Sequence, residues 1–489
     1  MKYANPILRG DYSDPDVIRV GEDFYMISSS FTYLPGIPVL HSRDLASWEI
    51  IGYAVKRLPF ARYDAPAHGC GTWAPSLRYH NKTFYVYVCL PDEGLFAFTA
   101  ADPAGEWECH FVKDVTGWID PCPLFDEDGS AYLIHGFAAS RVGIKNILYL
   151  HRMSPDGMKI LDNGRPVYDG VEHGDETVEG PKLYKRNGLY WIFCPAGGVT
   201  TGYQLALCAE NIYGPYTRHT VLCQGDTPVN GPHQGGWVTD GRGGDWFIHF
   251  QDAGAYGRIL HLQPVDWSGG VPVMGNGGYP VAGGDTGLAE YKASIPMSDD
   301  FSGGLGPQWQ WQANPNAAWY SELRPGLRLY AAPADSLFGA GNFLSQLMQA
   351  FDFDMEIRLK PHFHPGDRAG LGMMGWRYHY LAWDGEKIIL TEGKAERLSR
   401  FVPDSVKEIV LAEAECRGSA AKLIMRVRHG KAAFAFAPEG GSETPVGEEY
   451  PLSPGGWTGA RPGIFCMNMK GAWGGWADVE YCRVREAKA

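Results

Sequence analysis

The chain lacks the marks of several common classes of protein. Its ten cysteines form no CxxC pair and no zinc-ligand spacing, so we expect most of them to be buried free thiols. There is no glycine-rich coenzyme loop and no Ser-His-Asp order. No apolar run is long enough to cross a bilayer, and no basic amphipathic stretch suits a membrane surface. The 63 glycines and 34 prolines instead fit many short strands joined by turns.

The charge balance and the N-terminus limit the partners that we expect. The formal net charge is −13, with acids and bases mixed along the chain, whereas the phosphates of a nucleic acid need a basic surface. We therefore expect neither a nucleic acid nor a membrane as partner, and the oligomeric state is not readable. Residues 1–6 lead into the first repeat without an apolar leader, so we expect a cytoplasmic protein unless a leader has been trimmed.

A short pattern occurs five times in the first part of the chain, about every fifty residues. Each copy has an opening residue, a strand, a turn of hairpin residues and an aromatic-aliphatic run. The opening residues are Asp14, Trp73, Asp120, Glu179 and His233, and the runs are residues 24–27, 84–87, 131–134, 190–193 and 246–249. A period of this length built from strands predicts a five-bladed β-propeller with one sheet per blade.

The second part of the chain has a different pattern. A glycine-rich stretch over residues 269–287 interrupts the repeat. From about residue 297, apolar and polar residues alternate in strands without the opening residues, as in residues 355–359 and 422–427. Such alternation predicts an antiparallel β-sandwich. We therefore predict an all-β protein with a propeller over residues 1–290 and a sandwich over residues 297–489.

The opening residues are the candidate catalytic groups, because in a closed ring each lies at the mouth of a strand that lines the axis. Asp14, Asp120 and Glu179 would supply three carboxyls there, and cleavage of a glycosidic bond needs one carboxylic acid and one carboxylate. A low dielectric or a nearby carboxylate keeps such an acid protonated near neutral pH. An acid at a strand start often only accepts turn hydrogen bonds, but three at the same place in a repeat favour a catalytic role.

Other residues are candidates for contacts with a sugar or for support of the carboxyls. Trp73 and Phe31 are aromatic residues near the predicted carboxyls and are expected to stack on the apolar face of a sugar. Arg141 stands near a glycine in the third-blade loop, residues 136–146, and is also expected to contact the sugar. Four further acids lie off the repeat position and are expected to be solvated or to support the site: Asp11, Asp16, Glu172 and Glu176.

Four stretches of the chain together resemble one known family. They are residues 12–16 (Tyr-Ser-Asp-Pro-Asp), 71–75 (Gly-Thr-Trp-Ala-Pro), 119–121 (Ile-Asp-Pro) and 179–184 (Glu-Gly-Pro-Lys-Leu-Tyr). In this order they resemble glycoside hydrolase family 43, the five-bladed β-xylosidases, α-L-arabinofuranosidases and arabinanases. The resemblance covers the first ~290 residues, and the set is specific although each piece alone is weak. The second part looks like the concanavalin-like β-sandwich appended to the β-xylosidase and arabinofuranosidase branches.

The resemblance implies roles for individual residues. It implies Asp14 as general base, Glu179 as general acid, and Asp120 as the residue that tunes the pKa and orients. It also implies inversion at the anomeric carbon. Arg258 matches a family arginine at the sugar subsite, and His233 matches a histidine at the channel centre. Ser76 is a departure from the pattern, because many relatives have an aspartate there, and this puts a secondary contact in doubt.

His233 leaves two alternatives open. A lone histidine in such a ring is often hydrogen-bonded to a buried water or carboxylate. Some similar family members instead hold a calcium ion beside this histidine, beneath the catalytic carboxyls. Calcium prefers about six to eight oxygen ligands, so waters or carbonyls would have to complete the set around one imidazole nitrogen. We therefore predict His233 as a metal ligand if the channel holds calcium.

The function that the sequence predicts is exo-acting hydrolysis in xylan degradation, with a small oligosaccharide as substrate. The products would be terminal β-D-xylose or α-L-arabinofuranose from xylo-oligosaccharides or arabinoxylan fragments, and the sequence does not separate the two sugars. An arabinan- or fructan-type hydrolase is one alternative, although fructan hydrolases resemble each other by an Asn-Asp-Pro-Asn-Gly opening that this chain lacks. A non-catalytic sugar-binding propeller is the other, and turnover of a chromogenic xyloside discriminates the two classes.

Overall fold

The structure, a computed structural model, describes residues 1–397 and 403–487. Almost all of its regular structure is β-strand, and the described helices have three or four residues each. They are α1 (Ala139–Val142), α2 (Gly170–His173), η1 (Ala61–Asp64), η2 (Gly254–Tyr256), η3 (Ala317–Trp319) and η4 (Leu337–Gly339). No helix in this part of the chain is long and apolar enough to span a membrane. All ten cysteines have free thiols.

The first part of the chain is a five-bladed β-propeller, as predicted. Each blade is a four-stranded antiparallel sheet whose strands follow one another in the sequence. The blades are β2 (Asp16–Val20), β3 (Asp23–Ile27), β4 (Gly36–Ser42) and β5 (Glu49–Val55); β6 (Trp73–His80), β7 (Thr83–Leu90), β8 (Gly94–Ala100) and β9 (Glu108–Lys113); β10 (Trp118–Phe125), β11 (Ala131–Phe137), β12 (Ile147–Met153) and β13 (Arg165–Asp169); β14 (Lys182–Arg186), β15 (Leu189–Ala196), β16 (Tyr203–Ala209) and β17 (Thr217–Cys223); and β18 (Gly235–Thr239), β19 (Asp245–Asp252), β20 (Arg258–Asp266) and β21 (Val273–Met274).

Separate hydrophobic cores lie between neighbouring blades. Ile27 of the first blade packs with Leu77 of the second, and Ile134 of the third packs with Ile192 of the fourth. Since each blade buries both faces against its neighbours, the second strands are apolar over most of their length. The sequence shows them as the aromatic-aliphatic runs. The first strands of the blades pack around the axis, and this places the opening residues together at one end of it.

The two ends of the propeller are tied by a short sheet. β1 (Lys2–Ala4) pairs antiparallel with β22 (Gly283–Asp285). The Asn5 side chain donates to the carbonyls of Leu262 and Val281, both at 2.9 Å. The ring is therefore closed by contacts of its first and last segments, rather than by a blade that both ends share.

The second part of the chain is an antiparallel β-sandwich, also as predicted. Its two sheets enclose one large core that includes Trp383, Leu423 and Ile464. One sheet has the order β23 (Gln310–Trp311), β27 (Leu344–Ser345), β36 (Arg461–Asn468), β29 (Asp367–Met374), β30 (Arg377–Trp383), β31 (Lys387–Arg397) and β32 (Pro403–Glu415), with β26 (Ala332–Pro333) parallel to β36. The other has the order β24 (Tyr320–Glu322), β25 (Leu327–Tyr330), β37 (Trp476–Glu486), β28 (Phe353–His362), β33 (Ala421–Arg428), β34 (Lys431–Pro438) and β35 (Thr444–Pro451).

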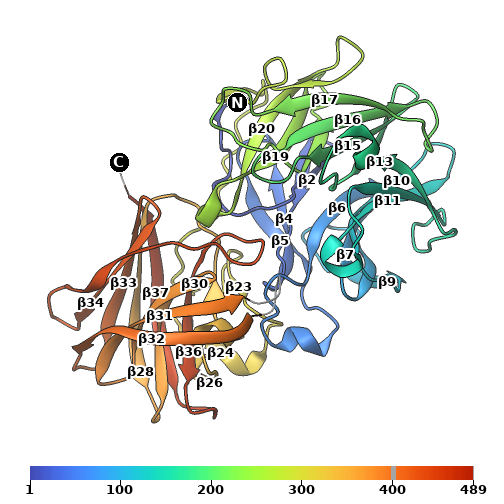
Figure 1. Ribbon diagram of the computed structural model, residues 1–489. Coiled ribbons are helices and arrows are strands. Elements are labelled where there is room, and N and C mark those ends of the chain that lie inside the picture. Colours follow the sequence, from blue (N-terminus) through green and yellow to red (C-terminus); the bar gives the residue numbers. More distant parts are fainter. Residues whose placement is uncertain (398–402, 488–489) are drawn as a thin grey trace.

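The propeller and the sandwich lie side by side and share backbone hydrogen bonds (Figure 1). Leu34, in the loop after β3, exchanges two backbone hydrogen bonds with Trp311 at 2.9 and 2.6 Å. Arg461 of the sandwich is buried, and its guanidinium stacks 3.8 Å from the ring centre of Tyr33. The sandwich therefore fixes the loop that carries Phe31.

Candidate active site

Four of the five repeats align in the structure on a residue with left-handed backbone that precedes a proline. Asp14, Ala74, Asp120 and Gly180 have φ angles of 55°, 37°, 57° and 57°. Trp73 and Glu179 each stand one residue earlier, so the expectation that all opening residues are equivalent is wrong for these two. A non-glycine residue in this conformation costs about 1–3 kcal/mol, and such strain gathers at functional sites.

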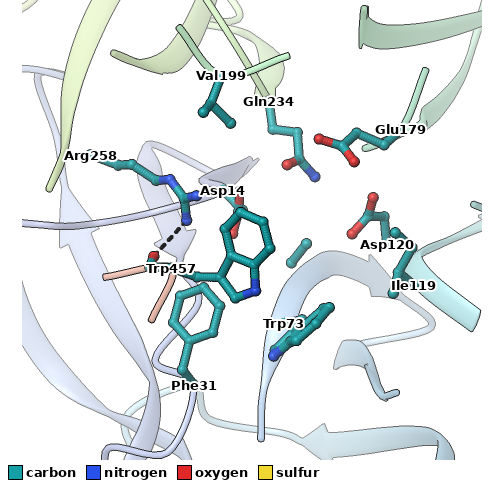
Figure 2. A pocket seen from close by; sticks show the side chains of 11 residues that line it. Asp14, Phe31, Trp73, Ile119, Asp120, Glu179, Val199, Gln234, Arg258 and Trp457 are labelled. Carbon is teal, nitrogen blue, oxygen red and sulfur yellow. Dashed lines mark hydrogen bonds between the residues drawn. The ribbon is translucent and has the colours of Figure 1, made fainter. Parts of the chain in front are cut away.

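The left-handed turns bring the three predicted catalytic carboxyls to one pocket at the end of the propeller axis (Figure 2). The lining residues are Asp14, Phe31, Trp73, Ala74, Ile119, Asp120, Glu179, Val199, Gln234, Arg258 and Trp457. Six residues were predicted from the propeller's repeats and loops to be catalytic or substrate-binding, and five of them line this pocket. Arg258, which the family resemblance supplied, lines it as well. The sixth, Arg141, is not among the lining residues.

Asp14 is held by two hydroxyl groups. The hydroxyls of Ser13 and Ser29 donate to Asp14 Oδ2 at 2.8 and 2.6 Å, and the Asp14 residue is only 6% exposed. Ser29 Oγ also accepts the backbone N–H of Ala74 at 2.7 Å, which links the first blade to the second. Donors aimed at an ionised carboxylate form the stronger, charge-assisted kind of hydrogen bond. The arrangement therefore suits a carboxylate that accepts a proton.

The surroundings of Glu179 favour its protonated form. Burial raises the pKa of its carboxyl to about 8, and the negative charges of Asp120 and Asp14 add to the effect. Its side chain is 28% exposed, but the exposed part faces the pocket. Burial also raises the pKa of Asp120 to about 7, against the lowering effect of the Gly180 N–H, which Asp120 Oδ2 accepts at 2.7 Å. Glu179 is thus the carboxyl that stays protonated near neutral pH.

His233 lies beneath Glu179, with its Nε2 3.4 Å from Glu179 Oε1, and it is fully buried. Burial, Arg258 and His249 lower the pKa of His233 to about 3, so its imidazole is neutral. Neither ring nitrogen has a hydrogen-bond partner within the described part of the chain. These nitrogens fit a buried water or a cation. Residues 1–397 and 403–487 hold no group of three or more His, Cys, Asp or Glu side chains suited to a metal, so His233 would be a lone ligand.

The walls of the pocket are aromatic and come from both parts of the chain. The ring centres of Phe31 and Trp73 lie 6.3 Å apart. Trp457, from the loop between β35 and β36 of the sandwich, stands edge-to-face with Trp73 at 6.4 Å. Arg258 Nη1 donates to the carbonyl of Trp457 at 2.7 Å, the dashed line in Figure 2. A sugar in this pocket would therefore meet side chains of both domains.

Arg141 contacts the ring of Trp73 instead of lining the pocket. Its guanidinium carbon lies 5.2 Å from the centre of the Trp73 ring, and its Nε donates to Asp92 Oδ1 at 2.8 Å. The structure therefore places Arg141 as a support of a wall residue. Its predicted contact with substrate remains a prediction.

The off-repeat acids differ from one another in their surroundings. Asp16 is fully buried, and its Oδ2 accepts from Arg78 Nη1 at 2.8 Å and lies 3.7 Å from Lys182 Nζ. Asp11 is buried as well, whereas Glu172 and Glu176 are exposed. The first pair therefore belongs to the interior next to the site and the second pair to the surface.

Sequence reasoning missed Trp457, Gln234 and Val199. Gln234 follows an opening residue and takes the place of the proline of the other repeats, a signal that was present in the sequence. Trp457 lies between glycines at residues 455–456 and 459. Val199 shows no sequence signal, because its place depends on how a loop of the fourth blade folds.

Models of two known families match the chain in succession. The model for Glycosyl hydrolases family 43 matches residues 3–272, and the model for the Beta xylosidase C-terminal Concanavalin A-like domain matches residues 298–485. The strands of the propeller and of the sandwich fall within these two ranges, apart from β21, the start of β1, β22 at the propeller's closure and the end of β37.

Whole-chain relatives agree with these matches. A putative beta-xylosidase from Xylanibacter ruminicola is 39% identical over 481 residues, which cover 94% of this chain and 85% of the relative. A non-reducing end alpha-L-arabinofuranosidase from Bacteroides ovatus is 28% identical, over 89% of this chain and 84% of the relative. A variant of a family 43 protein from Bacillus licheniformis has a crystal structure with a TM-score of 0.86, at 25% identity and 100% coverage of both chains. This chain therefore belongs to glycosyl hydrolase family 43.

Proposed function

We propose that this family 43 enzyme removes single β-D-xylose or α-L-arabinofuranose residues from the non-reducing ends of short oligosaccharides, with inversion. The observation that carries the proposal is that Trp457 of the sandwich lines the same pocket as the three carboxyls. A second domain at the mouth of the pocket favours the end of a sugar chain over its middle. The names of the relatives, beta-xylosidase and non-reducing end alpha-L-arabinofuranosidase, support both candidate sugars.

In the proposed mechanism Glu179 and Asp14 act on opposite sides of the scissile bond. Glu179, whose pKa is raised, donates its proton to the leaving oxygen as the bond between that oxygen and the anomeric carbon breaks. Asp14 accepts a proton from the water that attacks the anomeric carbon from the other face. Asp120 lies beside Glu179 and keeps its pKa high. Each turnover thus leaves Glu179 ionised and Asp14 protonated, and proton exchange with water restores both.

Trp73, Phe31 and Arg258 would hold the sugar in this mechanism. Apolar faces of sugar rings stack on aromatic side chains, and a guanidinium donates to sugar hydroxyls. If His233 binds calcium, the ion would add positive charge beneath the carboxyls and favour their ionised forms. The cytoplasmic location and the calcium ion remain predictions from the sequence.

Three assays test the proposal. Rates on the nitrophenyl glycosides of β-D-xylose and α-L-arabinofuranose would show which sugar is preferred, and NMR of the first product would show its anomeric form. Early digestion of a long xylan should release monosaccharide. A ladder of internal fragments would contradict exo action, and absence of turnover on xylosides, arabinofuranosides and arabinan would favour a sugar-binding propeller.

A further inference from the structure

Asp11 connects three segments that converge on the pocket, although its own side chain does not line it. It precedes Asp14 by three residues and is 6% exposed. Asp11 Oδ1 accepts the backbone N–H of Arg258 at 2.7 Å, and Asp11 Oδ2 accepts the backbone N–H of Gly459 at 2.8 Å. One carboxylate therefore binds the start of β20 in the propeller and the Trp457 loop of the sandwich at once.

The hydrogen bonds continue from Arg258 to the predicted general base. Arg258 Nη1 donates to Ser13 Oγ at 2.8 Å and to the carbonyl of Trp457 at 2.7 Å. Ser13 Oγ in turn donates to Asp14 Oδ2 at 2.8 Å. The chain of contacts runs from Gly459 through Asp11, Arg258 and Ser13 to Asp14. A shift of the Trp457 loop would therefore displace both Arg258, the predicted sugar-binding arginine, and Asp14, the predicted base.

The backbones of the two domains touch where Asp11 binds them. A Cβ atom on Gly459 would lie 2.6 Å from the backbone nitrogen of Gly257, and a Cβ on Gly257 would lie 2.4 Å from Asp11 Cγ. Gly257 also has a φ of 80°, which favours glycine. Ala460 N–H donates to the carbonyl of Ala255 at 2.7 Å beside this contact. Glycine at both positions lets the loop approach closely enough to reach Asp11.

Two backbone hydrogen bonds offset the cost of burying the Asp11 carboxylate. A buried carboxylate is costly unless it is hydrogen-bonded, and here the donors are two backbone amides from different domains. A buried backbone N–H group also needs an acceptor. The Asp11 carboxylate and the two segments that carry these N–H groups therefore stabilise each other. The position of the Trp457 loop is therefore set by a specific pair of hydrogen bonds in addition to its apolar packing.

We propose that Asp11 is a positioning residue that locks the Trp457 loop and Arg258 into the pocket in one arrangement, and that it thereby couples the sandwich to sugar binding. The proposal rests on the proposed function for its effect on catalysis. Its structural part, the restraint of residues 455–460, can be measured without any substrate.

The test compares Asp11→Asn with Asp367→Asn. Asparagine keeps one acceptor oxygen but replaces the other with a donor, so one of the two backbone amides loses its partner. Asp367 is the matched control, because it is 1% exposed and accepts the backbone N–H groups of His364 and Gly475 at 2.7 and 2.6 Å, within the sandwich and outside the pocket lining. Gly459→Ala, which presses the loop against Gly257, is the second variant should Asp11→Asn fail to fold.

In Asp11→Asn we expect KM for a nitrophenyl pentoside to rise about tenfold or more, with a smaller change in kcat, because displaced binding groups weaken sugar binding. Amide hydrogen exchange of residues 455–460 should speed up in Asp11→Asn and Gly459→Ala but not in Asp367→Asn. In a Trp457→Ala background the effect of Asp11→Asn on KM should be smaller than in the wild type, because only the part that acts through Arg258 remains.

The proposal is overturned if Asp11→Asn only lowers Tm, as Asp367→Asn is expected to do, with KM and the exchange of residues 455–460 unchanged. It is also overturned if the effects of Asp11→Asn and Trp457→Ala on KM are additive. An inactive wild-type protein would count against the proposed function alone, because the exchange measurement still decides whether Asp11 restrains the loop.

Discussion

Asp120 Oδ2 accepts the backbone N–H of Gly180 at 2.7 Å, so the carboxylate of the third blade is bonded to the residue that follows Glu179 in the fourth. This bond crosses from one blade to the next and holds the two carboxyls close together. Their proximity is one cause of the raised pKa of Glu179. The site thus uses the packing of two blades to keep an acid protonated.

The first prediction concerns the leaving group. Glu179→Ala should lower kcat/KM on xylo-oligosaccharides by about 10²–10⁴-fold, the range of a general acid. An activated aryl glycoside should be affected much less, because its leaving group needs no proton. The measurement is the loss of kcat/KM on xylo-oligosaccharides divided by the loss of kcat/KM on the aryl glycoside, from parallel assays. Equal losses on both substrates would show that Glu179 is not the acid.

The second prediction concerns the basic limb of the pH–activity profile. An acid with a pKa of about 8 is active when protonated, so activity should fall as the pH rises through that value. Asp120→Asn removes a negative charge that raises the pKa of Glu179, and the limb should therefore move to lower pH. The Asn side chain still offers an oxygen to the Gly180 N–H.

The measurement is kcat/KM between about pH 5 and 9. The control is Asp126→Asn, since Asp126 is a buried aspartate of the same blade that is bonded to Lys185 and Tyr190 and does not line the pocket. Asp126→Asn should leave the basic limb of the pH–activity profile at its wild-type pH. A basic limb that stays fixed in Asp120→Asn would mean that the Asp120 charge does not act on Glu179.

The third prediction concerns Lys182, which is 1% exposed beneath the site. Its Nζ donates to the carbonyl of Pro75 at 2.9 Å and to Ser76 Oγ at 2.7 Å. Lys182→Met leaves these acceptors and the nearby Asp16 carboxylate with fewer donors. We expect the free energy of unfolding to fall by about 3 kcal/mol, the lower end for a broken buried ion pair, because Arg78 still pairs with Asp16.

Chemical denaturation measures this change, with Lys185→Met as control. Lys185 is 24% exposed, and the hydroxyl of Tyr190 still donates to its partner Asp126, so the loss of Lys185 should cost less than the loss of Lys182. If both variants lose the same free energy of unfolding, the burial of Lys182 does not increase its contribution to stability. The contact of Lys182 with Ser76 also shows what replaces the aspartate expected at residue 76, namely a neutral hydroxyl acceptor.

Local sequence signals predicted the propeller and most of its pocket. The hairpin turns and aromatic-aliphatic runs depend on neighbouring residues alone, and they identified all five blades. Asp14, Asp120 and Glu179 were predicted as pocket residues because acids open three of the five repeats. The one-residue offset of Glu179 was not seen, because it depends on which residue takes the left-handed backbone conformation.

Contacts between the domains could not be predicted in the same way. Asp11 and Gly459 are 448 residues apart in the sequence, and their hydrogen bond exists only when both domains are folded and packed. Trp457 is a pocket residue for the same reason. Arg141 was predicted to contact substrate, and in the structure it contacts Trp73 and Asp92, which its place in the sequence does not indicate.

The last prediction concerns the occupant beneath Glu179. Both nitrogens of His233 are buried without a hydrogen-bond partner among the described residues, and a calcium ion with mainly water ligands, or water alone, would supply one. We expect exhaustive chelation to lower activity and added calcium to restore it, because the ion would favour the ionised form of the nearby base. His233→Ala should be insensitive to both treatments. Full activity after metal removal, verified by elemental analysis, would leave His233 bonded to water only.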